Sequence, residues 1–282
     1  MIVAAYQGPA VPGENEANAR VVVEELKHAT QLGASFACFP ESFLSGYDDT
    51  ELLLRSCVEV ESEWFQDFVN QCSHGDMVSI VGFSEKRGDE HFNSAAVMQG
   101  GRLLGVYSKA FCGSEYEAAA FGQGRDFGVF TANGVCFGVV ICADGGFIQP
   151  SRLMAMQGAR AIFSPHYNYI AFAGVETHRR KVRSDHIARA RENDCHFVRA
   201  NSVTVELRKM GTHVGAGYGD SYILDPNGYP LAEAGLFTTG WIHADIPDDQ
   251  LTGARPHPLE RIPRDVWEQY RDAADAWYAH RG

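Results

Sequence analysis

The stretch Val135-Cys136-Phe137-Gly138-Val139-Val140-Ile141, followed by Cys142-Ala143-Asp144, is the strongest strand signal in this chain. A short, uninterrupted apolar run of this kind is typical of a strand buried on both faces. The run ends at Cys142, whose thiol is a potential nucleophile. In α/β sheets, ligands bind beyond the carboxyl ends of the strands. The stretch therefore predicts an α/β fold with a reactive side chain at a strand end.

Strand and helix patterns alternate on both sides of this stretch. Buried strands are expected at residues 2–6, 35–39, 78–83, 161–163 and 196–198, and a hairpin around Gly100-Gly101 joins residues 93–97 to 102–107. Helices are expected at residues 15–29, 64–69, 151–158 and 175–193, with Asn15 and Ser151 capping the first and third. The turn at residues 225–228 is expected to connect strands at 221–224 and 241–246. This order predicts a mixed α/β sheet system with helices outside.

Length and composition favour one large globular domain. The chain has 282 residues, of which 45% are hydrophobic and 21% charged, and it shows no internal repeat or linker. We expect one domain over residues 1–255 and a C-terminal extension over residues 256–282. The extension carries three prolines and then a helical stripe of Val266, Trp267, Tyr270, Ala274 and Trp277. Because a stripe this apolar needs a cover, we expect it to lie at an oligomer interface.

Charge and cysteine pattern argue against several classes of protein. The net charge of −12 repels phosphate backbones and anionic lipid, so neither a nucleic acid nor a membrane is expected as a partner. No apolar run is long enough to span a bilayer, and the N-terminus lacks the pattern of a signal peptide. We therefore expect a cytoplasmic protein whose seven cysteines are reduced. No zinc-binding spacing occurs, so no metal site is expected.

Three reactive side chains follow three apolar runs. Glu41 follows residues 36–39, Lys109 follows residues 106–107, and Cys142 follows residues 135–141. If the strands are parallel neighbours, their carboxyl ends bring these side chains together. A buried carboxylate with a raised pKa can take the proton of a thiol, and a lysine can stabilise an oxyanion. The three residues together therefore predict an acyl-transfer site.

Further segments, in a fixed order along the chain, accompany these three residues. They are Phe39-Pro40-Glu41 with Gly46-Tyr47; Tyr107-Ser108-Lys109; Glu117 with Phe121 and Gly124; Gly138 to Asp144 with Arg152 and Gly158; Arg191-Glu192-Asn193 with Ala200-Asn201; and Gly219-Asp220-Ser221 with Asp225 to Gly228. In this order and spacing, from Ala4 to about Ile246, the chain resembles the nitrilase superfamily. These are carbon–nitrogen hydrolases that act on nitriles and non-peptide amides through a Glu-Lys-Cys triad.

The resemblance implies a four-layer α-β-β-α sandwich, usually assembled through helix faces into dimers or larger oligomers. It assigns Cys142 as the nucleophile, Glu41 as general base and then acid, and Lys109 as oxyanion stabiliser beside the Ala143 backbone N–H. Glu117 would orient the lysine or the attacking water. The chain departs from the family pattern at three points: Ala143 replaces a usual Tyr or Trp, Gln149 replaces a glutamate, and the spacing from Lys109 to Glu117 is shorter than usual.

Other side chains near these segments have two interpretations each. His166, Tyr167 and Asn168 follow a strand and are expected to line the pocket, although His166 could instead be a buried structural histidine. Cys112 could lie near the pocket, whereas the apolar neighbours of Cys136 favour a place in the core. The basic run at residues 178–183 could recognise an anion, but a solvated helix face is the preferred interpretation.

The sequence favours a hydrolase of a small amide that needs no cofactor and releases ammonia or an amine. True nitrilases of the resembling family tend to carry Trp-Glu after the nucleophile, whereas this chain carries Ala143-Asp144, so amides are preferred over nitriles. An N-carbamoyl amine hydrolase is the first alternative, followed by a nitrilase. The remaining alternative is a non-catalytic oligomeric scaffold, against which the intact Glu41, Lys109 and Cys142 argue.

Overall fold

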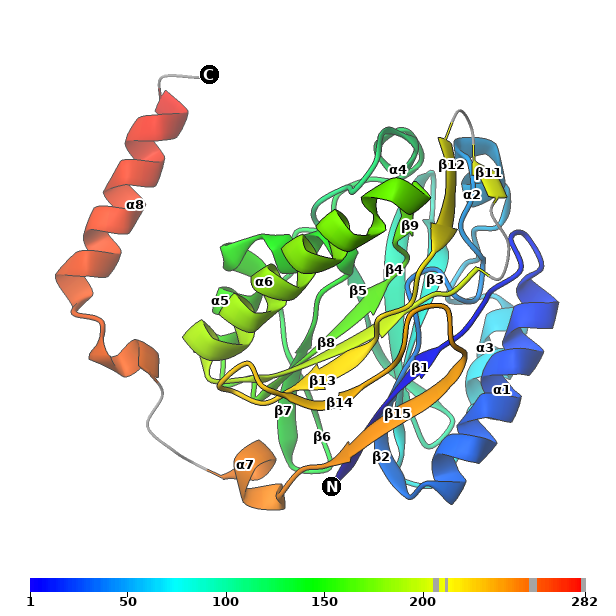
Figure 1. Cartoon of the computed structure of the whole chain (residues 1–282), viewed down its shortest axis with the longest axis horizontal. Helices are drawn as coiled ribbons and strands as arrows, with labels where there is room; N and C mark the ends of the chain where they lie inside the picture. The colour runs from blue at the N-terminus through cyan, green and yellow to red at the C-terminus, as the bar shows by residue number, and fades with distance from the viewer. Residues whose placement is uncertain (205–207, 211–212, 254–257, 280–282) are drawn as a thin grey trace.

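The computed structural model describes residues 1–204, 208–210, 213–253 and 258–279, which form two six-stranded sheets and a small third sheet (Figure 1). The first sheet has the strand order β15 (Gly240–Asp245), β1 (Ile2–Gln7), β2 (Ala34–Cys38), β3 (Val78–Arg87), β4 (Glu90–Gln99) and β5 (Arg102–Ser108). The second has the order β14 (Pro230–Glu233), β13 (Tyr222–Leu224), β10 (His196–Asn201), β8 (Ala161–His166), β7 (Val135–Val139) and β6 (Phe130–Ala132). The small sheet contains β11 (Arg208–Met210), β12 (His213–Gly217) and β9 (Tyr169–Ile170).

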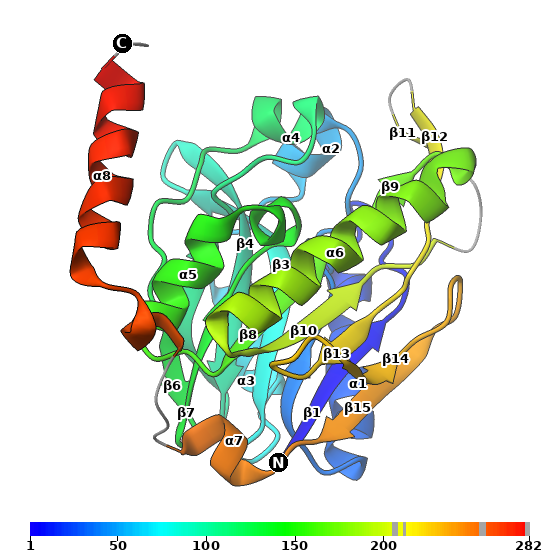
Figure 2. The same ribbon diagram turned by 60° about the vertical axis from the view of Figure 1, so that its left-hand side comes forward.

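Helices cover the outer faces of the two large sheets, which confirms the expected α-β-β-α sandwich (Figures 1 and 2). On the first sheet lie α1 (Asn15–Gln31) and α3 (Glu63–Gln71), and on the second α5 (Ile148–Met156) and α6 (Val175–Asn193). Helix α1 buries Val22, Leu26 and Ala29, which recur at three- and four-residue steps and so form one apolar face. The shorter helices are α2 (Thr50–Arg55), α4 (Glu115–Ala120) and α7 (Asp248–Thr252), with single 3₁₀ turns at η1 (Cys142–Gly146), η2 (Phe172–Gly174) and η3 (Pro258–Arg261).

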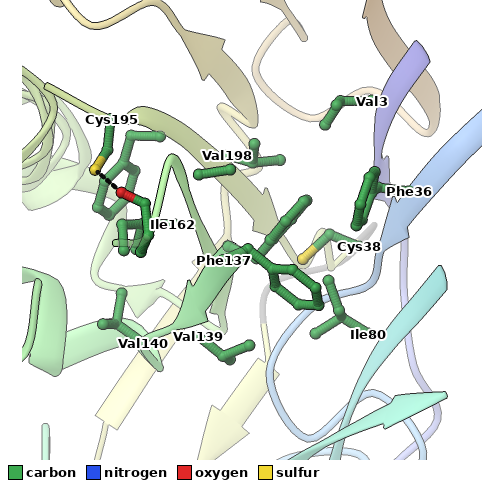
Figure 3. Close-up of a cluster of buried hydrophobic side chains, with 14 of the residues drawn as sticks. Val3, Phe36, Cys38, Ile80, Phe137, Val139, Val140, Ile162, Cys195 and Val198 are labelled. Carbon is green, nitrogen blue, oxygen red and sulfur yellow. Dashed lines mark hydrogen bonds between the residues drawn. The ribbon is translucent and has the colours of Figure 1, made fainter. Parts of the chain in front are cut away.

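The core between the two sheets is apolar and aromatic (Figure 3). Phe36 of the first sheet lies 5.4 Å from the ring of Phe137 and 5.5 Å from that of Phe163, both on the second sheet. Phe137 and Phe163 contact each other edge to face at 5.5 Å. Aromatic contacts of this geometry add to the free energy that burial of the rings supplies. They fix how the two sheets lie on each other.

The carboxyl ends of the parallel strands in both large sheets lie at the same end of the sandwich. In the first sheet β1, β2 and β3 are parallel, and β5 runs the same way because it and β3 are both antiparallel to β4. In the second sheet β7, β8 and β10 are parallel. The expected hairpin between β4 and β5 is confirmed, and because of it β5 ends beside the carboxyl ends of β2 and β3. Residues that follow β2, β5, β7 and β8 therefore converge.

Three expectations of local structure were wrong. Asn15 is the first residue of α1, not its cap, and its side chain donates instead to the Ser56 carbonyl. Ser151 lies inside α5, which begins at Ile148. The turn at residues 225–228 joins β13 to β14, while residues 240–245 form β15 beside β1. A tight turn pairs a strand with the next one along the chain, so β15 was free to close the edge of the other sheet.

The C-terminal extension contains the expected helix, α8 (Arg264–Ala279), which Figures 1 and 2 show beside the sandwich on the side of α5. Its predicted stripe is largely exposed: 56% of Tyr270 and 50% of Trp277 are accessible to solvent. The Tyr270 hydroxyl accepts a hydrogen bond from the side chain of Gln149 at 3.1 Å. The stripe thus lacks a complete cover within the described chain, and the division at residue 255 stays a prediction.

Candidate active site

Glu41 lies where the carboxyl ends of the strands converge, and it is 1% exposed. It follows β2, and Gly82 of β3 allows the loop to pass close, because a Cβ at that position would lie 2.5 Å from its backbone. The Oε1 atom accepts hydrogen bonds from Lys109 Nζ at 2.6 Å and Asn93 Nδ2 at 2.8 Å. The Oε2 atom accepts one from the backbone N–H of Tyr167 at 2.7 Å. Burial raises the pKa of Glu41, although Lys109 opposes the shift.

Lys109 follows β5 and joins two carboxylates. Its Nζ lies 2.6 Å from Oε1 of Glu41 and 2.6 Å from Oε1 of Glu117. Burial alone would lower the pKa of Lys109, but the Glu117 and Glu41 carboxylates outweigh it and raise that pKa well above its ordinary value. The lysine is therefore an ammonium ion throughout the ordinary pH range.

Glu117 reaches the lysine across a short loop despite the spacing of eight residues. It lies in α4, which begins after Ser114, whose hydroxyl accepts the Glu117 backbone N–H as a cap. Its Oε2 accepts the backbone N–H of Gly113 at 2.6 Å, so Glu117 fixes both the lysine and the loop that follows it. The compact turn compensates for the short spacing from Lys109.

Cys142 opens the 3₁₀ turn η1 three residues after Val139, the last residue of β7, and its φ is +47°. A left-handed conformation is uncommon for a residue with a side chain, and it occurs most often at functional turns. Asn168 Nδ2 donates to the sulfur at 3.4 Å. Burial and the neighbouring Glu41 carboxylate raise the pKa of the Cys142 thiol. The thiol is therefore protonated at neutral pH and needs a base to react.

Asp144, which the sequence singled out only as a neighbour of the nucleophile, ties the cysteine turn to the lysine loop. Its Oδ1 accepts the backbone N–H groups of Ala110 at 3.1 Å and Phe111 at 2.9 Å. Its Oδ2 accepts the Ile141 N–H at 3.0 Å and the Tyr107 hydroxyl at 2.8 Å. Burial raises the pKa of Asp144 to about 6. The carboxylate thus joins the two sheets through hydrogen bonds to both.

Asn93 is a second site residue that the sequence did not reveal. It lies within β4, is 1% exposed, and donates through Nδ2 to Glu41 Oε1 at 2.8 Å and to Glu117 Oε1 at 2.6 Å. One amide thus separates two carboxylates that would otherwise repel each other. A buried asparagine is costly without partners, so its place at the start of the strand expected at residues 93–97 was the available signal.

These side chains line a cavity of about 440 Å³, a size suited to a small molecule. All eight site residues expected from the sequence border it: Glu41, Lys109, Glu117, Cys142, Ala143, His166, Tyr167 and Asn168. His166 is also a buried structural histidine, because its Nε2 hydrogen-bonds to Ser164 at 2.9 Å and burial holds its pKa well below its ordinary value. Cys112 borders the cavity as well, whereas Cys136 lies away from it. Within the described ranges, no group of three or more metal-binding side chains is placed to hold an ion.

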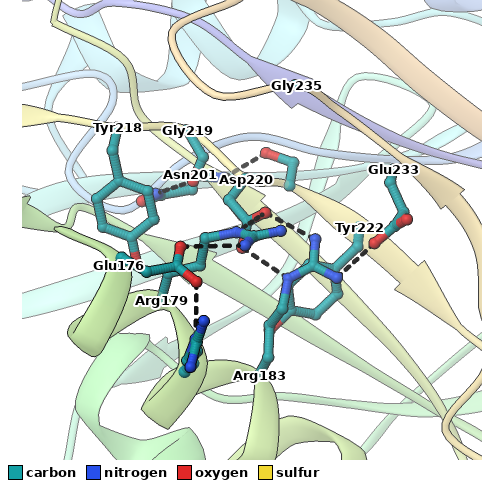
Figure 4. Close-up of polar contacts among 12 residues, drawn as sticks. Glu176, Arg179, Arg183, Asn201, Tyr218, Gly219, Asp220, Tyr222, Glu233 and Gly235 are labelled. Carbon is teal, nitrogen blue, oxygen red and sulfur yellow. Dashed lines mark hydrogen bonds and ion pairs between the residues drawn. The ribbon is translucent and has the colours of Figure 1, made fainter.

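The basic run at residues 178–183 is not simply a solvated face. His178 and Lys181 border the cavity. Arg179 donates to Asp220 at 2.9 Å and Arg183 does so at 2.6 Å, so these two arginines form an ionic cluster behind the cavity (Figure 4). Asp220, with 2% exposure, is the residue that draws them inward. The sequence prediction missed this because the partner lies some forty residues further along the chain.

All seven cysteines are free thiols, as expected. None of the described helices combines the length and the apolar character that a bilayer crossing requires.

Comparison with known proteins gives relatives of several kinds. The glutamine-dependent NAD(+) synthetase of Thermotoga maritima is 32% identical over 149 residues, which cover 51% of this chain but 26% of the synthetase. The first such relatives therefore match over only about a quarter of their own length. The (R)-stereoselective amidase of Pseudomonas sp. is 27% identical over 77% of this chain and 74% of its own. N-carbamoylputrescine amidase of Solanum tuberosum is 31% identical over 70% of this chain and 65% of its own.

Solved structures and family models agree with the architecture. A double mutant of an amidase from Nesterenkonia sp. AN1, in complex with acrylamide, superposes with a TM-score of 0.76 at 21% identity, over 96% of this chain and 97% of its own. This likeness shows the same fold. Residues 2–256 match the family model of the carbon–nitrogen hydrolases. The chain thus belongs to the carbon–nitrogen hydrolase family.

Proposed function

We propose that the protein hydrolyses the carbon–nitrogen bond of a small amide through a thioester on Cys142. One observation carries the proposal. A protonated thiol, a buried carboxylate with a raised pKa and a buried ammonium ion border one small cavity, with Lys109 Nζ 2.6 Å from Glu41 Oε1. This set contains a nucleophile, a base and an oxyanion stabiliser.

In the first half of the reaction, Glu41 takes the proton from the Cys142 sulfur as the sulfur attacks the amide carbonyl carbon. The carbonyl oxygen becomes an oxyanion, which Lys109 Nζ and the Ala143 backbone N–H stabilise. The tetrahedral intermediate then collapses as the carbon–nitrogen bond breaks. Glu41 returns its proton to the departing nitrogen, which leaves as ammonia or an amine.

In the second half, Glu41 takes a proton from a water molecule, whose oxygen attacks the thioester. The second tetrahedral intermediate breaks its carbon–sulfur bond, and the sulfur regains a proton from Glu41. Glu117 and Asn93 act by position: they hold Lys109 and the Glu41 carboxylate in place through contacts of 2.6 Å to 2.8 Å. No cofactor is required by these steps.

An N-carbamoyl amine is the second candidate substrate, favoured by the match to N-carbamoylputrescine amidase over 70% of the chain. A carbamoyl group presents the same carbonyl and amide nitrogen to the triad. Amides and carbamoyl amines remain preferred over nitriles, because Ala143-Asp144 follows the nucleophile in place of Trp-Glu. The synthetase relatives match over too little of their length to extend the proposal to their activity.

Ammonia release from a panel of amides, carbamoyl amines and nitriles tests this proposal. Cys142→Ala should lose activity by about 10³-fold or more, with Glu41→Gln and Lys109→Ala nearly as severe, because residues that act as a unit fail together. Cys136→Ala is the matched control, since this thiol lies outside the cavity, and it should keep wild-type turnover. Turnover by Cys142→Ala, or loss of it in Cys136→Ala, would refute the assignment of the nucleophile.

We further infer a cytoplasmic homodimer or larger homo-oligomer whose interface includes the 256–282 extension. Exposure of Tyr270 and Trp277 supports an interface, and the acidic net charge supports the absence of nucleic-acid and membrane partners.

A further inference from the structure

A chain of buried hydrogen bonds leads from the nucleophile to the ionic cluster behind it. Asn168, which is 5% exposed, donates through Nδ2 to Cys142 Sγ at 3.4 Å. On the other side of the same amide, Oδ1 accepts from Arg199 Nη2 at 2.5 Å and from the Tyr218 hydroxyl at 3.4 Å. Arg199 is completely buried. The mechanism above uses none of these contacts.

The contact with Arg199 decides which way the amide faces. A guanidinium carries only N–H donors, so the atom of Asn168 that faces it must be the oxygen. The NH₂ group is therefore forced toward the sulfur of Cys142. An amide without such a neighbour could rotate and present its oxygen, which would repel a thiolate.

Arg199 is itself held rigidly from behind. Its Nη1 donates to the Gly219 carbonyl at 3.2 Å and to the Asp220 carbonyl, and the Asp220 carboxylate lies 3.5 Å away. Arg179 and Arg183 of α6 fix that carboxylate in turn (Figure 4). The guanidinium therefore has little freedom to move away from the amide.

The strand that carries Arg199 also holds the backbone of the same loop. Arg199 and Asn201 lie two residues apart in β10 and so point to the same face. Asn201 Oδ1 accepts the backbone N–H of Asn168 at 3.1 Å. The preceding backbone N–H, that of Tyr167, donates to Glu41. One rigid loop thus meets both the base and the nucleophile.

We propose that Asn168 stabilises the thiolate of Cys142 with its side-chain N–H, and that Arg199 is the positioning residue that fixes the orientation of this amide. As Glu41 removes the thiol proton, negative charge develops on the sulfur beside this amide. The Asn168 N–H then becomes a charge-assisted hydrogen bond, which is stronger than a neutral one. This inference rests on the proposed role of Cys142 as nucleophile.

Alkylation of Cys142 by methyl iodide, which has no carbon–nitrogen bond, is followed across pH by peptide mass spectrometry and tests the inference without any substrate. The rate reports the thiolate fraction, because only the thiolate reacts. Asn168→Ala should slow alkylation at pH 7.5 by about 10- to 100-fold and shift its pH profile upward, as expected for the loss of a hydrogen bond to a charged group. Asn168→Asp should slow it further, since a carboxylate oxygen would face the sulfur.

The order of these two variants separates electrostatics from packing. Aspartate has the shape of asparagine, so a merely structural role predicts that Asn168→Asp is the milder change. Arg199→Met should shift the profile as Asn168→Ala does, and should add nothing in the Asn168→Ala background. If Arg199→Met does not fold, Arg199→Lys replaces it, with a profile between wild type and Asn168→Ala. Tyr222→Phe is the control, because it removes a buried hydroxyl that bonds His186 beside Arg199 without touching Asn168.

Wild-type alkylation profiles in folded Asn168→Ala and Asn168→Asp would overturn the inference, as would a milder effect of aspartate than of alanine. A wild-type profile in the folded Arg199 variant would overturn the role of Arg199. Wild-type hydrolysis of the amide panel is measured separately. A protein that hydrolyses no amide but shows the predicted profiles would count against the proposed function and not against the Asn168 contact.

Discussion

Replacing Asp144 by asparagine tests how much the hydrogen bonds of its carboxylate, which join the two sheets, contribute to the stability of the fold. The carboxylate accepts four hydrogen bonds, from the backbone of Ala110, Phe111 and Ile141 and from the Tyr107 hydroxyl. Asparagine keeps one oxygen, which can still accept the first two. Its NH₂ group must then face the Ile141 N–H, whereas the Tyr107 hydroxyl can rotate to accept. One buried backbone N–H is left without a partner.

A buried donor without a partner costs about 1 to 3 kcal/mol, and the loss of the charge on the remaining acceptor adds to this. We therefore expect Asp144→Asn to lower the free energy of unfolding by about 2 to 3 kcal/mol. Tyr107→Phe, which removes one donor and leaves no buried backbone group unpaired, should lower it by about 1 kcal/mol. Urea titration at fixed protein concentration, with the slope checked for constancy, measures both values.

The difference between wild type and Asp144→Asn should also depend on pH. The folded-state pKa of Asp144 is about 6, above the value of 3.8 that an unfolded chain gives. The folded state therefore binds the proton more tightly, so the contribution of protonated Asp144 to stability is lost as pH rises through about 6. The destabilisation by asparagine should be about 1 kcal/mol larger at pH 5 than at pH 7.5. An Asp144→Asn protein with wild-type stability at both pH values, or a larger effect at pH 7.5, would refute this reasoning.

Further predictions concern the site and the assembly. Asn93→Ala, which removes the amide that donates to both carboxylates, should lower kcat by about 10²-fold without unfolding, and an unchanged kcat would show that the amide has no role. Because burial raises the pKa of Glu41 and the base must be ionised, kcat/KM should fall on acidification with a midpoint above 4.5; a midpoint at or below that value would contradict the shift. Deletion of residues 256–282 should reduce the oligomeric mass in light scattering, and a full-length protein of 31.0 kDa at all concentrations would contradict an assembly. An amide should be hydrolysed with a higher kcat/KM than the nitrile of the same acyl chain, and a tenfold preference for the nitrile would overturn this ranking.

Those parts of the site that depend on a single strand end could be predicted from the sequence. Glu41, Lys109 and Cys142 each stand where an apolar run stops, and a strand end in an α/β sheet is a place for chemistry. The sandwich followed from the resemblance to a family. Alternation of strands and helices alone predicted only a mixed α/β system.

The residues that escaped prediction depend on pairings between distant parts of the chain. Asn93 contacts both Glu41 and Glu117 only because β4 lies beside the loop of Glu41 and close to α4. Asp144 joins the two sheets only because the first sheet places residues 107–111 beside the turn that carries Cys142. In the sequence, Arg199 directly follows the strand expected at residues 196–198, and nothing there shows that it contacts Asn168. Each depends on strand order and on the packing of one sheet on the other, which a single sequence does not specify.

The two halves of the proposed active site belong to different sheets. The proposed base Glu41 and the ammonium ion of Lys109 follow β2 and β5, while the proposed nucleophile Cys142 and the amide of Asn168 follow β7 and β8. Their separation therefore depends on how the sheets pack, through the aromatic contacts of Phe36, Phe137 and Phe163 in the core and the hydrogen bonds of Asp144 at the site. A slide of one sheet over the other by the width of a bond would pull the proton donor from its acceptor while every strand stayed intact. Turnover therefore depends on the relative position of the two sheets. On heating, it should decline before circular dichroism reports any loss of secondary structure.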